Sequence, residues 1–121
     1  MMATSSFICE FAEQVVKMMV EHVVLFKWQD DATPEAIESV GQSILALKDK
    51  IPGVIDLAYG EDFTKTRSQG FTHALVVRMA NKDVVAFYDA HPEHVKVITQ
   101  IRTIVDKILA VDFESPRHTP N

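Results

Sequence analysis

The segment VEHVVLFKW, residues 20–28, is rich in β-branched and aromatic residues and is therefore predicted to be a strand. Successive side chains of a strand point to opposite faces of a sheet. Val24 and Phe26 then lie on one face and Val23 and Leu25 on the other, so neither face is polar. A sheet that contains this strand must be covered on both faces, and this requirement constrains the fold more than any other feature.

The rest of the chain alternates between patterns typical of strands and of helices. The predicted order is strand 20–28, helix 34–51, strands 54–62 and 71–79, a short helix 81–91, a long helix 92–109 and a short strand 110–113. This is β-α-β-β-α-β, with the second helix broken in two. The sequence thus predicts an α+β fold, with a ferredoxin-like sheet and its helices on one face.

Residues that favour the start of a helix support two of these predictions. Thr33 can accept a hydrogen bond from the first helical turn, and Pro34 suits the first helical position. Asn81 is expected to cap the short helix in the same way.

The helices can cover only one face of a four-stranded sheet, so the other apolar face would meet water. Monomeric proteins rarely expose an apolar patch of that size. A chain of 121 residues forms one domain with a modest core. We therefore expect a homodimer in which two sheets pack face to face around a barrel-like core.

Composition excludes several classes of partner. The net charge is -5 and no cluster of Lys and Arg occurs, which argues against nucleic acid and anionic membrane surfaces. No apolar run is long enough to span a membrane. The single cysteine, Cys9, cannot form an internal disulfide. With no clear targeting signal, we expect a protein of the reducing cytoplasm.

Two terminal segments are expected to lie outside the domain, which we place at residues 19–114. Residues 1–18 carry apolar side chains at helical spacing, as in Phe7, Phe11 and Val15, and are predicted to form a short amphipathic helix. Residues 115–121 are predicted to form a loose polar tail.

The segment FYDAHPEHV, residues 87–95, combines the residue types of an acid–base site. His91 precedes Pro92, which places His91 at the cap of the long helix and His94 in its first turn. A helix start disfavours a charged imidazole, so His94 could act as a base near neutral pH. Tyr88 could donate a hydrogen bond to a carbonyl or enolate oxygen.

Structural roles remain open for the same residues. His91 could serve only as a cap, and Tyr88 could be a packing residue. His22 and His73 point from strands and could satisfy buried hydrogen bonds. Asp112 could lie on the surface or orient a histidine.

Several motifs together resemble one family, the stress-responsive A/B barrel or Dabb domains of plants and bacteria. The motifs are VEHVVLFKW, YGED at 59–62, QGFTHALVV at 69–77, AHPEHV at 90–95 and DKILAVDF at 106–113. The resemblance covers roughly residues 19 to 114. It implies a dimeric α+β barrel that is described in the family by its induction under stress.

The resemblance also implies a site. In a plant branch of the family that cyclises polyketides, the matching tyrosine and second histidine are catalytic, and they match Tyr88 and His94. The branch's strand histidines line its pocket, and the first helix supplies aromatic residues that this chain lacks at 37–50. The residues expected to line a pocket here are His22, Val24, Phe26, His73, Leu75 and His91.

Side chains give little indication of a metal, and no cofactor is expected from them. Some relatives hold an ion resembling Mg²⁺ through main-chain carbonyls at the end of the first helix. The matching positions are Leu45, Lys48 and Ile51. Such a backbone site leaves no pattern of side chains.

Two functions follow as alternatives. The first is a stress-associated dimeric domain of unassigned biochemistry that could bind a small apolar ligand. The second is a polyketide-cyclase-like enzyme, a lyase that closes a ring by an aldol reaction with Tyr88 and His94. An empty pocket that reaches His94 would favour the second, whereas a pocket filled by Trp28, Phe71 and Phe87 would favour the first.

Overall fold

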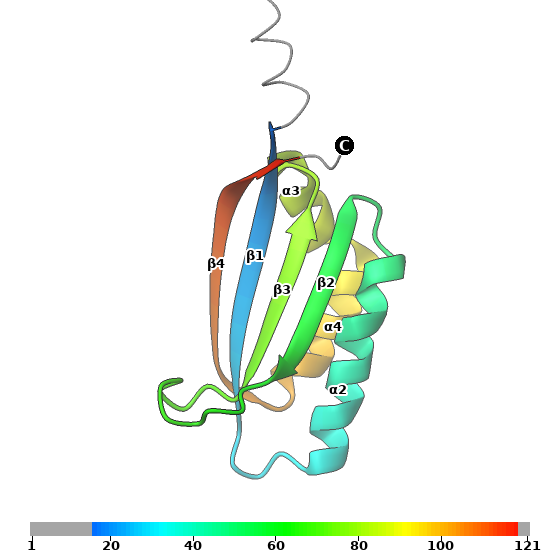
Figure 1. The fold of residues 1–121 in the computed structure, drawn as a ribbon. Helices are drawn as coiled ribbons and strands as arrows, with labels where there is room; N and C mark the ends of the chain where they lie inside the picture. The colour runs from blue at the N-terminus through cyan, green and yellow to red at the C-terminus, as the bar shows by residue number, and fades with distance from the viewer. Residues whose placement is uncertain (1–15, 119–121) are drawn as a thin grey trace, which may run out of the picture.

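A computed structural model describes residues 16–118 as one antiparallel sheet with helices on one face (Figure 1). The strand order across the sheet is β2-β3-β1-β4. The strands are β1 (Val16–Trp28), β2 (Val54–Glu61), β3 (His73–Met79) and β4 (Val105–His118). The predicted α+β, ferredoxin-like order of elements is confirmed.

The helices are α2 (Pro34–Ala46), the 3₁₀ turn η1 (Leu47–Asp49), α3 (Lys82–Ala90) and α4 (Pro92–Arg102). Three side chains cap them as predicted. Thr33 accepts a hydrogen bond from the Ala36 N–H, Asn81 from the Val84 N–H and His91 from the Glu93 N–H. Each cap satisfies one of the backbone donors that a helix start leaves without a partner.

The core lies between the helices and the face of the sheet that carries Val24 and Phe26. Its fully buried members come from both layers, as with Val77 on β3 and Ile44 on α2. The opposite face of the sheet, which we call the open face, has no helix over it (Figure 1). The open face carries Val23 and Leu25, as the alternation predicts.

The prediction of one long helix over residues 92–109 is wrong for the residues after Arg102. The helix α4 ends at Arg102, and residues 105–109 begin β4. The whole of β1 pairs with β4, from Val16 opposite His118 to Trp28 opposite Val105. Had residues 105–109 stayed helical, part of that edge of β1 would have lost its backbone partners. Pairing therefore prevails over the helical spacing of the apolar residues.

The long β4 strand also changes both predicted ends of the domain. Residues 16–18 extend β1 rather than forming a helix, and residues 115–118 pair with residues 16–19 rather than forming a loose tail. The rest of the predicted N-terminal helix lies outside the described residues. Among residues 16–118, no helix is long and apolar enough to cross a membrane.

Candidate functional site

A cavity of about 290 Å³ lies between the sheet and the helices. One part of its wall is polar and the rest is apolar. The polar part comes from β1, α3, α4 and β4 and comprises His22, Tyr88, Asp89, His94 and Asp112. The apolar part comprises Val24, Phe26, Ile44, Leu47, Leu75, Val97, Ile98, Ile101, Ile108 and Ala110.

The main chain of Asp89 selects the tautomer of His94. The Nδ1 atom of His94 lies 3.1 Å from the Asp89 carbonyl oxygen. A carbonyl only accepts hydrogen bonds, so Nδ1 carries the proton and donates it. The Nε2 atom of neutral His94 then carries a free lone pair, which is the form that a general base requires.

The surroundings of His94 also favour its neutral form. Burial lowers the pKa of His94 below its ordinary value, and the nearby His22 and His91 lower it further. The Asp89 carbonyl and carboxylate oppose this shift, but burial is the largest cause. His94 is therefore a neutral base at pH 7.

Tyr88 lies against His94, with ring centroids 4.3 Å apart. The Tyr88 side chain is 1% exposed, and burial is the main reason that its pKa is raised. Its hydroxyl therefore stays protonated at neutral pH and can donate a hydrogen bond. Among residues 16–118, no protein group takes that bond, so the donor is available to a ligand.

His22 reaches the same cavity from β1 and is held by Asp112 on β4. The Nδ1 atom of His22 lies 2.5 Å from Oδ1 of Asp112. Since an ionised carboxylate only accepts, Nδ1 of His22 is the donor of this hydrogen bond. The edge of the His22 ring meets Tyr88, with centroids 5.7 Å apart. His22, Tyr88 and His94 thus form one contiguous group.

His73 lies away from this group, near the other end of the sheet. Its Nδ1 atom accepts a hydrogen bond of 3.0 Å from the Trp28 indole, and its ring stacks on Tyr59. Burial lowers the pKa of His73, although Glu61 opposes the shift. His73 and His91, which were expected to line a pocket with His22, do not line the 290 Å³ cavity, and His91 caps α4.

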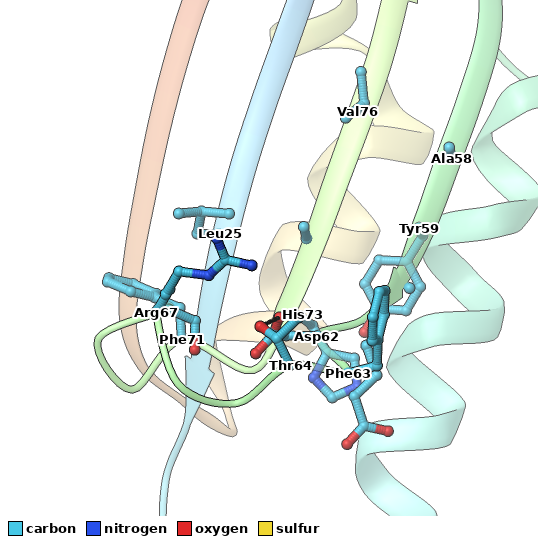
Figure 2. Close-up of a pocket in the computed structure, with 14 residues that line it drawn as sticks. Leu25, Ala58, Tyr59, Asp62, Phe63, Thr64, Arg67, Phe71, His73 and Val76 are labelled. Carbon is cyan, nitrogen blue, oxygen red and sulfur yellow. Dashed lines mark hydrogen bonds between the residues drawn. The ribbon is translucent and has the colours of Figure 1, made fainter.

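A second and larger cavity, of about 660 Å³, lies on the open face (Figure 2). The floor of this cavity is formed by β2, β3 and Leu25 of β1, and the β2–β3 loop forms a wall with Phe63, Arg67 and Phe71. Figure 2 shows His73 and Tyr59 at its margin. Nδ1 of His73 accepts from the Trp28 indole, so Nε2 of neutral His73 carries the proton. This histidine is therefore less suited than His94 to act as a base.

The positions predicted for an ion lie around the end of α2, with Leu45 in its last turn, Lys48 in η1 and Ile51 just beyond. The Ile51 carbonyl accepts a hydrogen bond from the Val54 N–H, and the Lys48 ammonium lies 3.7 Å from Asp56. Within the described part of the chain, no group of three or more His, Cys, Asp or Glu could hold a metal. The main-chain site at Leu45, Lys48 and Ile51 stays a prediction, and the Ile51 carbonyl already accepts one hydrogen bond.

Some site residues left no signal in the sequence. Asp89 acts through its main-chain carbonyl, which every residue possesses. Val24, Phe26 and Leu75 were expected in the apolar wall, whereas Ile44 of α2 and Leu47 of η1 carried no sign of a pocket. The pairing of Asp112 with His22 required the β1–β4 register, which sets the two residues opposite each other.

Comparisons with known proteins identify the family of the domain. A sequence model described as the Stress responsive A/B Barrel Domain matches residues 20–115. A stress-response A/B barrel domain-containing protein of Arabidopsis thaliana is 35% identical over 100 residues, which are 82% of this chain and 38% of that protein. Olivetolic acid cyclase of Cannabis sativa is 30% identical over 101 residues, which are 83% of this chain and 99% of that enzyme.

A solved structure supports the ferredoxin-like fold. A dimeric ferredoxin-like protein of unknown function from Thermobifida fusca superposes with a TM-score of 0.73 at 27% identity. The match covers 82% of this chain and 92% of that one. The chain spans little more than a third of the Arabidopsis protein, so the activity of such a longer relative does not transfer with the domain. This chain belongs to the stress-responsive A/B barrel, or Dabb, domain family.

Proposed function

We propose that the chain binds a small, partly apolar carbonyl compound in the 290 Å³ cavity and catalyses an aldol ring closure of the polyketide-cyclase kind. One observation supports this proposal above the others. The cavity is open at both Tyr88 and His94, and the aromatic side chains of Trp28, Phe71 and Phe87 do not line it. A neutral base and a phenol donor therefore face the same empty volume.

The reaction uses His94 as the base. Its free Nε2 removes a proton from a carbon that lies between two carbonyl groups of the substrate, which leaves an enolate. The carbon of that enolate attacks a second carbonyl of the same molecule and closes a ring. The new alkoxide takes a proton from the imidazolium of His94, and loss of water then gives the unsaturated ring.

Tyr88 stabilises the charge that develops on oxygen. Its protonated hydroxyl donates to the carbonyl that becomes the alkoxide, which is the role of an oxyanion-hole donor. His22 contacts Tyr88 and is held in one tautomer by Asp112. We assign this pair to the positioning of Tyr88, because the His22 ring lies against Tyr88 and Asp112 fixes its orientation.

The remaining wall defines the substrate class. Ten aliphatic or aromatic residues face the polar group, so the ligand has a polar, carbonyl-bearing end and an apolar end. A volume of about 290 Å³ lies at the low end of ligand pockets, which span roughly 300–1,000 Å³. The likeness to olivetolic acid cyclase supports this class.

The test is turnover of linear poly-β-keto acids with short alkyl ends, followed by mass spectrometry and by the absorbance of the cyclised product. We expect cyclisation by the native chain and a loss of about 10²–10⁴-fold in rate for His94→Gln and Tyr88→Phe, because each removes a catalytic group. Tyr59→Phe is the matched control, since it removes a tyrosine hydroxyl outside the cavity.

A second candidate is the stress-associated domain that binds such a ligand without changing it. Several relatives from Arabidopsis thaliana are named for the stress response, which favours this role for the domain. This role predicts that a poly-β-keto acid raises the melting temperature of the native chain and that the compound itself remains linear. The increase in melting temperature should be smaller for His94→Gln. If no compound is bound or cyclised, both candidates fail.

The partner that we propose in either case is a second copy of the chain, joined through the open face. Leu109, Val111 and Phe113 are each about half exposed on this face of β4. An apolar face of this kind is rarely left in water. The likeness to the dimeric protein of Thermobifida fusca supports the same arrangement. Sedimentation that shows a stable monomer at micromolar concentration would contradict it.

A further inference from the structure

The wall of the 290 Å³ cavity carries acidic side chains but no basic ones. Its two carboxylates are Asp89 of α3 and Asp112 of β4. Among the residues of the described chain that line it, none is a lysine or an arginine. A ligand in the cavity therefore meets negative charge and finds no fixed cation.

Both carboxylates lie where the cavity meets water. Asp89 and Asp112 are exposed, as is the lining residue Ala110 on the same strand as Asp112. That strand, β4, forms the edge of the sheet farthest from β2 (Figure 1). Phe26 and Ile44 are fully buried and line the deep part of the cavity. The cavity thus has an apolar deep end and an acidic mouth.

The charge of Asp89 reaches both groups of the proposed chemistry. Burial is the main cause of the pKa shifts of Tyr88 and His94, and the Asp89 carboxylate raises both pKa values. Coulomb interactions fall off with distance and with screening by water, so this carboxylate lies close to both side chains. Within residues 16–118, Asp89 forms no ion pair that would offset its charge.

Neither histidine of the cavity offsets this charge. Burial lowers the pKa of His94 and so keeps it neutral at pH 7. The Nδ1 atom of His22 donates to Asp112, so that any positive charge on His22 is balanced by the adjacent carboxylate. The His22–Asp112 pair therefore brings no net positive charge to the wall.

One lysine lies on the outer side of Asp112. Lys82 and Asp112 line a separate surface hollow of about 410 Å³. There the Lys82 ammonium lies 3.2 Å from a carboxylate oxygen of Glu114, and Lys82 does not line the 290 Å³ cavity. It therefore offers little to a negative group inside the cavity.

We propose that the cavity binds its carbonyl ligand in an uncharged form, as an amide, ester or thioester, and disfavours the free carboxylate. This inference rests on the function proposed above and names the form in which the substrate binds. A carboxylate that enters the cavity loses water and gains no cation in return, which is costly. An uncharged carbonyl group loses less water and can accept a hydrogen bond from Tyr88.

The keto acids of the turnover test are then weaker ligands than their amides and esters. The acidic mouth thus acts as a charge filter, because it lowers the affinity for an anion without touching the apolar end of the ligand.

The first test compares two ligands of nearly equal shape, a linear diketo acid with a pentyl end and its primary amide. Binding of each compound to the native chain is measured by calorimetry at pH 7. We expect the acid to bind at least about tenfold more weakly than the amide, because like charges that face each other across an interface repel strongly.

The second test removes the charge of Asp89. Asp89→Asn keeps the main-chain carbonyl that accepts from His94. It should strengthen binding of the acid by about two- to fivefold and leave binding of the amide unchanged, since the lost charge is exposed. Asp83→Asn is the matched control, because it makes the same change on the same helix outside the cavity. Asp112 is left intact in these variants because it orients His22.

The third test adds the missing cation. Ala110→Lys places an ammonium at the mouth, at an exposed position that tolerates a longer side chain. We expect this variant to bind the acid more tightly than the amide, because a charged hydrogen bond then replaces the repulsion. Circular dichroism checks that both variants keep the native fold.

Two outcomes would overturn the inference and leave the proposed function intact. One is an acid that binds the native chain as tightly as its amide. The other is a ratio of the two affinities that neither Asp89→Asn nor Ala110→Lys changes. If neither compound binds and no keto acid or amide is cyclised, the proposed function itself fails, so the two failures are distinguishable.

Discussion

Burial and one main-chain hydrogen bond together decide the chemistry of His94. Burial removes water from the imidazolium and lowers its pKa, while the Asp89 carbonyl places the remaining proton on Nδ1. The same carbonyl favours the charged form, but burial prevails. A residue that sequence identifies only as a histidine near a helix start becomes a neutral base with a defined free nitrogen.

The pKa of His94 can be tested by NMR. We expect its ring protons to titrate below pH 6.5, the ordinary value for histidine. Between the lowered value and 6.5 the unfolded chain binds more protons than the folded one. The stabilisation linked to His94 is therefore complete above pH 6.5 and is lost as pH falls through the lowered value.

The matching variant is His94→Gln, which keeps a polar side chain but cannot titrate. Its free energy of unfolding should depend less on pH just below 6.5 than that of the native chain. A His94 midpoint at or above 6.5 would rule out the role of burial and weaken the case for a base.

At the scale of elements, His91 ends one helix and begins the next. Its N–H donates to the Tyr88 carbonyl at the end of α3, and its Nδ1 accepts from Glu93 at the start of α4. The residue before a proline avoids the helical region, and His91 has the extended ψ of 134°. This break lets Tyr88 and His94 face each other from two different helices.

Removal of the cap should affect stability rather than chemistry. His91→Ala is expected to lower the free energy of unfolding by about 1 kcal/mol, the usual cost of a lost N-cap. His91→Asn is the control, because asparagine supplies an equivalent acceptor and should restore most of the loss. Urea denaturation measures both, and turnover per folded molecule should stay unchanged. A large loss of turnover with normal stability would instead assign His91 to the cavity.

At the scale of the whole molecule, adjacent residues of β1 face two different environments. Val24 is 4% exposed beneath the helices, whereas Leu25 lies on the open face beside the larger cavity. One strand therefore contributes both to the core of the protomer and to the proposed interface.

A carboxylate at these two positions should give opposite results. Val24→Asp buries an unpaired charge and should destabilise the protomer, by on the order of 3–5 kcal/mol. Leu25→Asp should leave the protomer folded but weaken the dimer, because the charge would be buried only on association. Circular dichroism and sedimentation of the two variants separate these effects. If Leu25→Asp remains a dimer of native affinity, the open face is not the interface.

Local patterns determined most of the fold. The strand alternation, the caps at Thr33, Asn81 and His91 and the order of elements all follow from interactions within a few residues. The pair Tyr88 and His94 could be named because Pro92 fixes the backbone between them. The end of α4 could not be predicted, because Ile104 and Ile108 suit a helix as well as a strand.

Contacts between distant segments decided the rest. The pairing of β1 with β4 turned residues 105–109 into a strand and brought Asp112 beside His22, 90 residues away. The same packing separated His73 from the cavity of His94, although both histidines were expected in one pocket. The sequence alone determines which residues alternate, cap and carry protons. Only the tertiary structure decides which of them meet, because register and burial depend on partners far along the chain.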